Sequence, residues 1–104
     1  MRKLVFDIAS ISIGESGSGE TEIHGRCCGD EIRPGDRVSY MVLYGTGSDA
    51  VQLKEPLKLT VTRVAPTFGR EIGCIPSAYS GTLYVRASEA IGVRFGWTME
   101  GLNA

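Results

Sequence analysis

One histidine and three cysteines have side chains that could bind a soft metal ion or supply a nucleophile: His24, Cys27, Cys28 and Cys74. A zinc site would need all four to converge tetrahedrally. Neighbouring residues on a strand point to opposite faces, so Cys27 and Cys28 should diverge, and buried thiols pack as small apolar groups. A cysteine nucleophile would need a base, and His24 could approach a thiol only if its strand bends. We expect no metal site, no cofactor and a solvent-facing His24 between Glu22 and Arg26.

Carboxylates and glycines offer two other kinds of chemistry. The carboxylates of Glu20, Glu22, Asp30, Glu31 and Asp36 gather around predicted turns, where paired acid and base groups are conceivable and a solvated rim explains them equally well. The glycine-rich segment 14–19 has no following lysine and precedes a strand, so it lacks the helix N-terminus of a phosphate-binding loop. We expect no catalytic residues and no small-molecule substrate.

Basic and aromatic residues alternate in the second half of the chain. Aromatic rings between cations can stack on the bases of single-stranded nucleic acid. In the alternative interpretation the aromatic residues are buried or partly buried in a barrel and the arginines keep the protein soluble. The formal net charge of −1 argues against a general phosphate-backbone binder. Contact with RNA therefore stays an alternative, carried by Lys54, Lys58, Arg63, Arg70, Arg86 and Arg94 with Phe68, Tyr79, Tyr84 and Phe95.

Predicted loops present side chains of the kinds enriched at protein–protein interfaces. Phe68, Arg70 and Tyr79 fall in such loops, and Arg63 and Arg86 fall on predicted strands. We predict that these five residues contact a partner. In the competing interpretation Phe68 closes one end of a barrel.

The composition limits the class of protein. The 104 residues, 42% of them hydrophobic, suit one domain spanning 1–104. No apolar run approaches the roughly 18 residues of a membrane span. An odd number of cysteines without an export signal favours reduced thiols, so we expect a cytoplasmic protein that does not enter a membrane.

Short strands separated by turn signals dominate the sequence and predict an all-β sandwich or small barrel of six or seven strands. In segment 3–13 the alternation changes phase between Ile8 and Ile11, which predicts a bulge. Turns are expected at Pro34-Gly35-Asp36 and Ser80-Gly81. The expected strands are 3–13, 20–28, 37–44 (with Val38, Tyr40, Val42 and Tyr44 on one face), 57–64, 82–86 and 91–99, and 87–91 could form a helical turn.

Segment 29–38, with its Gly-Asp-Arg-Val ending, resembles a turn in the second domain of translational GTPases of the elongation factor Tu type. Three other features occur in the same order as in that domain. They are Gly25-Arg26 before the turn, Ser80-Gly81 before segment 83–86, and an Arg-Phe-Gly-Trp step at 94–97. The resemblance covers nearly the whole chain. It implies a single Greek-key β-barrel of the translation-protein type.

In that family the nucleotide chemistry belongs to a separate GTPase domain, and the barrel helps to hold the aminoacyl end of transfer RNA and packs on its neighbours. The residues that contact RNA there cannot be carried over, because the corresponding loop differs. We therefore expect a non-enzymatic binding module that acts through a protein partner. The alternatives are an RNA or translation-machinery contact, a small immunity-type inhibitor of another protein, and a thiol- or carboxylate-dependent enzyme.

Overall fold

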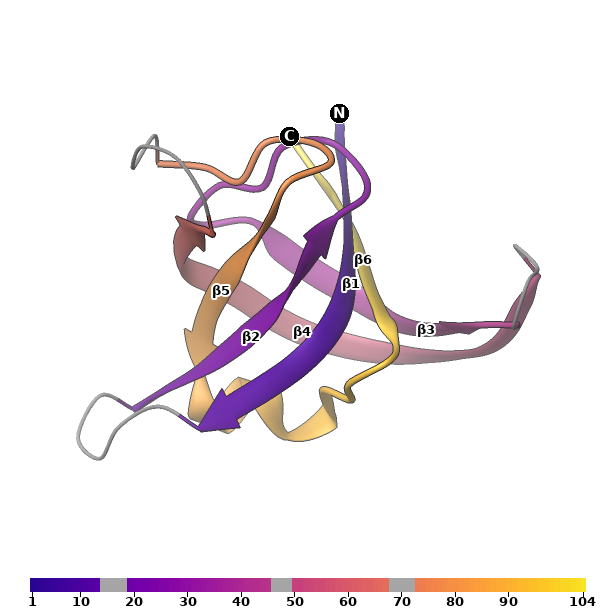
Figure 1. The fold of residues 1–104 in the computed structure, drawn as a ribbon. Coiled ribbons are helices and arrows are strands. Elements are labelled where there is room, and N and C mark those ends of the chain that lie inside the picture. The colour runs from indigo at the N-terminus through magenta and orange to yellow at the C-terminus, as the bar shows by residue number, and fades with distance from the viewer. Residues whose placement is uncertain (14–18, 46–49, 68–72) are drawn as a thin grey trace.

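Six antiparallel strands close into a ring in the computed structural model, which describes residues 1–13, 19–45, 50–67 and 73–104 (Figure 1). Their order around the barrel is β1-β2-β5-β4-β3-β6, and β6 pairs with β1. Because β2 and β3 are consecutive in sequence but not adjacent, the connection between them is of the Greek-key type. The predicted all-β, six-stranded barrel is confirmed. The elements are β1 (Arg2–Ile13), β2 (Glu20–Cys27), β3 (Arg37–Tyr44), β4 (Val51–Pro66), β5 (Ser80–Arg86), the 3-10 helix η1 (Ala87–Gly92) and β6 (Thr98–Asn103).

A bulge in β1 confirms the predicted phase change. The register with β2 shifts between Ile8 and Ser10, so Ile8 faces the core while Ile11, three residues later, also packs against it. A bulge increases local twist and bends the strand. The bend lets the first half of β1 pair with β6 and its second half continue along β2.

The interior of the barrel is filled by large side chains from every strand. Barrels of this size have room only for such side chains, so the core is not a ligand cavity. One fully buried residue from each strand, in the order β1 to β6, is Phe6, Ile23, Met41, Val61, Leu83 and Met99.

The turn before β3 forms as predicted. The amide of Asp36 donates to the carbonyl of Arg33 over 3.1 Å, and Gly35 adopts a φ of +92°, as the third position of a type II turn requires. The Asp36 carboxylate in turn accepts the amide of Arg33 at 2.9 Å. The side chain thus holds the turn closed from within.

The predicted alternation along β3 is wrong. Val38 and Met41 are buried, whereas Ser39 and Tyr40 are exposed, because the register with β4 shifts between Val38 and Tyr40. Alternation does not resume after this shift, since Met41 and Val42 are both buried and a second shift follows between Leu43 and Tyr44. Tyr40 therefore lies on the outer surface instead of beside Val38.

Two other expectations were also wrong. Segment 91–97 is not a strand: Val93 hydrogen-bonds back to Ala90, Gly96 has a φ of +82°, and Phe95 is 74% exposed, so β6 starts only at Thr98. Ser80 and Gly81 belong to β5, and the turn lies just before them, where the amide of Tyr79 donates to the carbonyl of Pro76.

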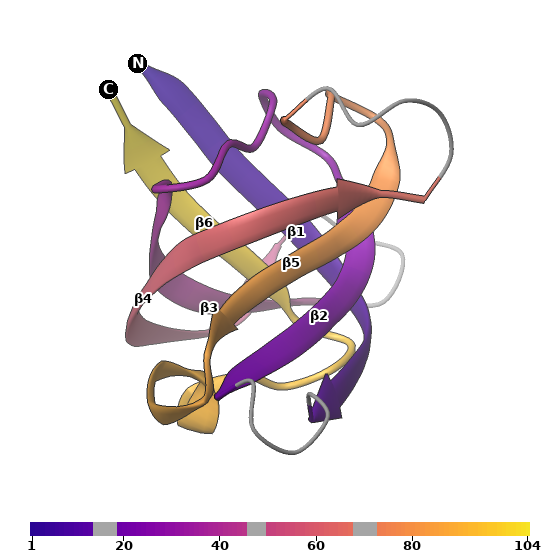
Figure 2. The ribbon, with the colours of Figure 1, turned by 90° about the vertical axis from the view of Figure 1, so that its left-hand side faces the viewer.

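Strand β4 is longer than expected and has two partners. Val51–Thr60 lies along β3, and Val61–Pro66 lies along β5. Figure 1 shows β3 and β4 running together away from the body of the barrel, and Figure 2 shows both chain ends at one end of the barrel with η1 at the other. Among the described residues, no helix is long and apolar enough to cross a membrane.

Candidate functional site

The structure does not gather the five predicted partner-contacting residues into one site. Phe68 and Arg70 lie outside the described residues. Tyr79 is 52% exposed just before β5, and Arg86 is exposed at the other end of that strand. A single contact area around β5 is therefore not formed by the described members of the set.

Arg63 is exposed but already engaged. Its guanidinium pairs with Glu20 at 2.9 Å and lies 4.1 Å from the ring centre of Tyr84. The hydroxyl of Thr62 donates to the same carboxylate at 2.8 Å. The hydrogen bond from Thr62, followed by that from Arg63, lowers the pKa of Glu20. Arg63 thus joins β4 to β2, and it could reach a partner only by leaving these contacts.

The three thiols are poorly suited to nucleophilic chemistry. Cys27 is buried, donates to the carbonyl of Asp30 at 3.1 Å, and has its pKa raised by burial. Cys28 is exposed, and burial of part of its surface together with Asp7 raises its pKa. Burial and Glu31 raise the pKa of Cys74. Since the thiolate is the reactive form, these shifts lower nucleophilicity. The predicted divergence of Cys27 and Cys28 is confirmed.

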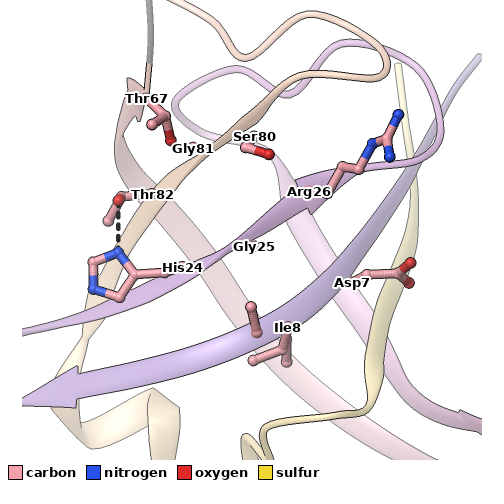
Figure 3. Close-up of a pocket in the computed structure, with 10 residues that line it drawn as sticks. Asp7, Ile8, His24, Gly25, Arg26, Thr67, Ser80, Gly81 and Thr82 are labelled. Carbon is pink, nitrogen blue, oxygen red and sulfur yellow. Dashed lines mark hydrogen bonds between the residues drawn. The ribbon is translucent and has the colours of Figure 1, made fainter.

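His24 lies in a shallow pocket of about 390 Å³ on the outer surface of β1, β2 and β5 (Figure 3). Its Nδ1 is 2.8 Å from the hydroxyl of Thr82, so the ring is held against β5 and half-buried instead of freely solvated. Figure 3 shows Asp7 and Arg26 at the far end of the same pocket. His24 and Cys27 are on opposite faces of β2. Within the described ranges, no three His, Cys, Asp or Glu side chains are grouped to hold a metal ion.

A different surface, formed by strands that are distant in sequence, has the features of a binding site. It surrounds Tyr40 on the outside of β1, β6, β3 and β4, where Lys3 pairs with Leu102 and Tyr40 pairs with both Glu100 and Pro56. Two grooves, of about 540 and 520 Å³, share Ser39 and Tyr40 as lining residues. We call this surface the Tyr40 face and define it by Lys3, Arg37, Ser39, Tyr40, Lys54, Pro56, Lys58 and Leu102.

The Tyr40 face is positively charged although the whole chain has a net charge of −1. Lys3, Arg37, Lys54 and Lys58 are all exposed, and among the described residues none of their charged side-chain nitrogens forms an ion pair with a carboxylate. The Nζ atom of Lys54 lies 4.2 Å from the ring centre of Tyr40, a cation–π contact.

Two glutamates also line these grooves, Glu89 in one and Glu100 in the other. The hydroxyl of Tyr44 donates to the carboxylate of Glu100, and the amide of Thr60 donates to Glu89. Both carboxylates keep their charge, but among the described residues neither forms an ion pair with the four cations, which outnumber them on this face.

Exposed apolar side chains also belong to the Tyr40 face. Tyr40 is 42% exposed and Leu102 is 64% exposed. Exposed apolar side chains that occur together indicate an interaction surface more strongly than isolated ones do. Combined with unpaired cations, they favour a partner that is acidic and partly apolar.

One edge of β4 is also open. Within the described ranges, Val51–Thr60 pairs with β3 alone, and β5 joins β4 only from Val61. At the end of the open part, Glu89 of η1 accepts the amide of Thr60 at 2.9 Å. Pro56, which has no amide hydrogen, lies in the open part, as is usual for prolines in edge strands.

Comparison with protein-family models gives no match, and comparison with curated proteins gives none either. The resemblance to the second domain of translational GTPases therefore rests on the sequence features alone. What the structure establishes independently is the closed six-stranded barrel and the geometry of its surface.

Proposed function

We propose that this protein is a non-enzymatic binding module that engages a protein partner through the Tyr40 face. The observation that carries the proposal is the combination of four cations that form no ion pair among the described residues with the exposed apolar side chains of Tyr40 and Leu102. Tyrosine is enriched at interface centres.

The barrel would serve as a rigid support for that surface. Four strands contribute to the face, and each is anchored by an inward side chain that is fully buried. Binding to a preformed surface costs little conformational entropy. The filled interior and the raised pKa values of the thiols support a binding role over catalysis. The free cysteines suit the cytoplasmic location that we propose with it.

The proposal is tested by placing a photo-crosslinking amino acid at Ser39, between the two grooves, and at the exposed Ser10 on β1 as the matched control, which lines neither groove. We expect a crosslinked polypeptide from native lysate at position 39 that is absent at position 10 and lost when Tyr40→Ala is added. Equal crosslinking at both positions would contradict the proposal.

The same experiment separates the alternative functions. The RNA-contact alternative relies on the same cations, and crosslinks at Ser39 that disappear with ribonuclease but not with protease would favour it. An immunity-type inhibitor would instead capture one enzyme and lower its activity in proportion to complex formation.

A further inference from the structure

We propose that the ligand of the Tyr40 face is an extended acidic segment of the partner, which adds as a strand to the open edge of β4. This inference rests on the proposed protein-binding function and names the kind of segment that is bound. Strand addition satisfies backbone groups at a sheet edge and leaves alternate side chains to determine specificity.

The backbone of β4 provides the first requirement. In the part of the chain that the structure describes, Val51–Thr60 has a strand on one side only, so backbone groups on its other side face outward. The amide of Thr60, at the end of this edge next to η1, donates to the carboxylate of Glu89. An approaching chain with acidic side chains would find the same kind of contact along the rest of the edge.

The side chains of β4 provide the second requirement. Lys54, Pro56 and Lys58 occupy alternate positions and are all exposed. The two lysines are four residues apart, which corresponds to roughly 13 Å along a strand. An added strand would place acidic side chains opposite Lys54 and Lys58 and an apolar side chain opposite Pro56. The expected motif is thus an acidic residue, an apolar residue two positions later, and a second acidic residue after two more.

Two observations favour a polypeptide over a nucleic acid. An open strand edge offers hydrogen bonds to a peptide backbone, whereas phosphate binding would use the cations alone. A basic patch on a chain with a net charge of −1 is a weak electrostatic footprint for nucleic acid.

The test uses a display library of random nine-residue peptides, selected on the wild-type protein. We expect enrichment of peptides with two acidic residues four positions apart. A synthetic peptide of the enriched sequence should bind the K54E/K58E variant at least about tenfold more weakly, because like charges would face each other. The matched control R26E/R86E, with the same change in net charge on exposed residues elsewhere, should retain wild-type binding.

Two further measurements address the geometry. Replacing both acidic residues of the peptide with lysine should restore binding to K54E/K58E and abolish it for the wild type. N-methylation of the peptide amides at one set of alternate positions should prevent binding, whereas N-methylation at the other set should leave it unchanged. Only an added strand explains this difference. Melting temperatures of both charge-reversal variants should match that of the wild type, since all four residues are exposed.

Selected peptides without an acidic excess, or peptides that bind K54E/K58E as well as the wild type, would overturn the inference. A polypeptide crosslink at Ser39 that depends on Tyr40 would in that case still support the proposed function. Binding of a single-stranded oligonucleotide, lost in K54E/K58E, without any selected peptide would overturn the inference in favour of nucleic acid.

Discussion

The guanidinium of Arg2 and the carboxylate of Asp36 form a bidentate pair, with both N–O distances at 2.7 Å. The pair joins the first residue of β1 to the turn that precedes β3, and its Asp36 side chain is 6% exposed. The same carboxylate accepts the amide of Arg33. One side chain thus closes the turn and ties it to the neighbouring strand.

Asp36→Ala should destabilise the protein by about 2–3 kcal/mol, since it leaves Arg2 and the Arg33 amide without their acceptor. For a chain of this length the melting temperature should fall by about 10 °C or more, measured by circular dichroism. The control is Arg33→Ala, which removes an ion pair with Glu31 whose side chains are 50% and 39% exposed, and whose loss should change the melting temperature far less. Equal effects of the two variants would refute the structural role of Asp36.

Gly25→Ala should also destabilise the barrel, by about 2 kcal/mol or more. A Cβ atom at this position would overlap the backbone carbonyl of Asp7, on β1 next to its bulge. The matched control is Gly45→Ala, where the nearest atoms belong to the side chain of Gln52, which can move. Chemical denaturation of both variants measures the difference, and a fully stable Gly25→Ala protein would show that β1 and β2 are farther apart than described.

Acid should weaken the link between β2 and β4. Hydrogen bonds from Thr62 and Arg63 lower the pKa of Glu20, so its contribution to stability is complete above its ordinary pKa of about 4.3 and is lost as the pH falls through the lower folded value. The difference in melting temperature between the wild type and Glu20→Gln should therefore be largest near neutral pH, shrink as the pH falls below the ordinary pKa, and disappear once the pH is below the lowered pKa of folded Glu20. A difference that is constant with pH would contradict this assignment.

Asp7→Asn should make Cys28 more reactive. Partial burial is the largest cause of the raised pKa of the Cys28 thiol, and the hydrogen bond to Asp7 and the negative charge of Asp7 raise it further. Removing the charge raises the thiolate fraction at neutral pH, and alkylation by iodoacetamide should become faster. Peptide mass spectrometry distinguishes Cys28 from Cys74, whose rate should be unchanged. Identical rates at Cys28 in both proteins would exclude a role for Asp7.

Local features of the fold could be predicted because they depend on neighbouring residues. The bulge in β1 follows from the phase change between Ile8 and Ile11, and the turn before β3 follows from Pro34, Gly35 and Asp36. Two errors had different causes. The register shift between the strands β3 and β4 moved Tyr40 to the outside. Over 91–97 the backbone itself departs from a strand, through the Val93–Ala90 hydrogen bond and the positive φ of Gly96.

The candidate site could not be predicted, because contacts between distant strands decide which residues meet there. Lys3, Tyr40, Lys54 and Leu102 come from four strands, and only the ring order brings them to one surface. Sequence reasoning selected Arg63 as a contact residue because an isolated arginine on a strand gives no sign of the carboxylate that occupies it. That carboxylate, Glu20, is 43 residues away in the chain.

The position of β6 has a consequence for how the molecule is made. Thr98–Asn103 pairs with β1 on one side and β3 on the other, and Arg2 lies opposite Asn103. Until this segment has been synthesised, β1 and β3 each lack a neighbour, and Met99 is not yet present between Phe6 of β1 and Met41 of β3. The ring therefore cannot close before β6 is available, so the native barrel is expected to form late relative to the synthesis of β1 to β5.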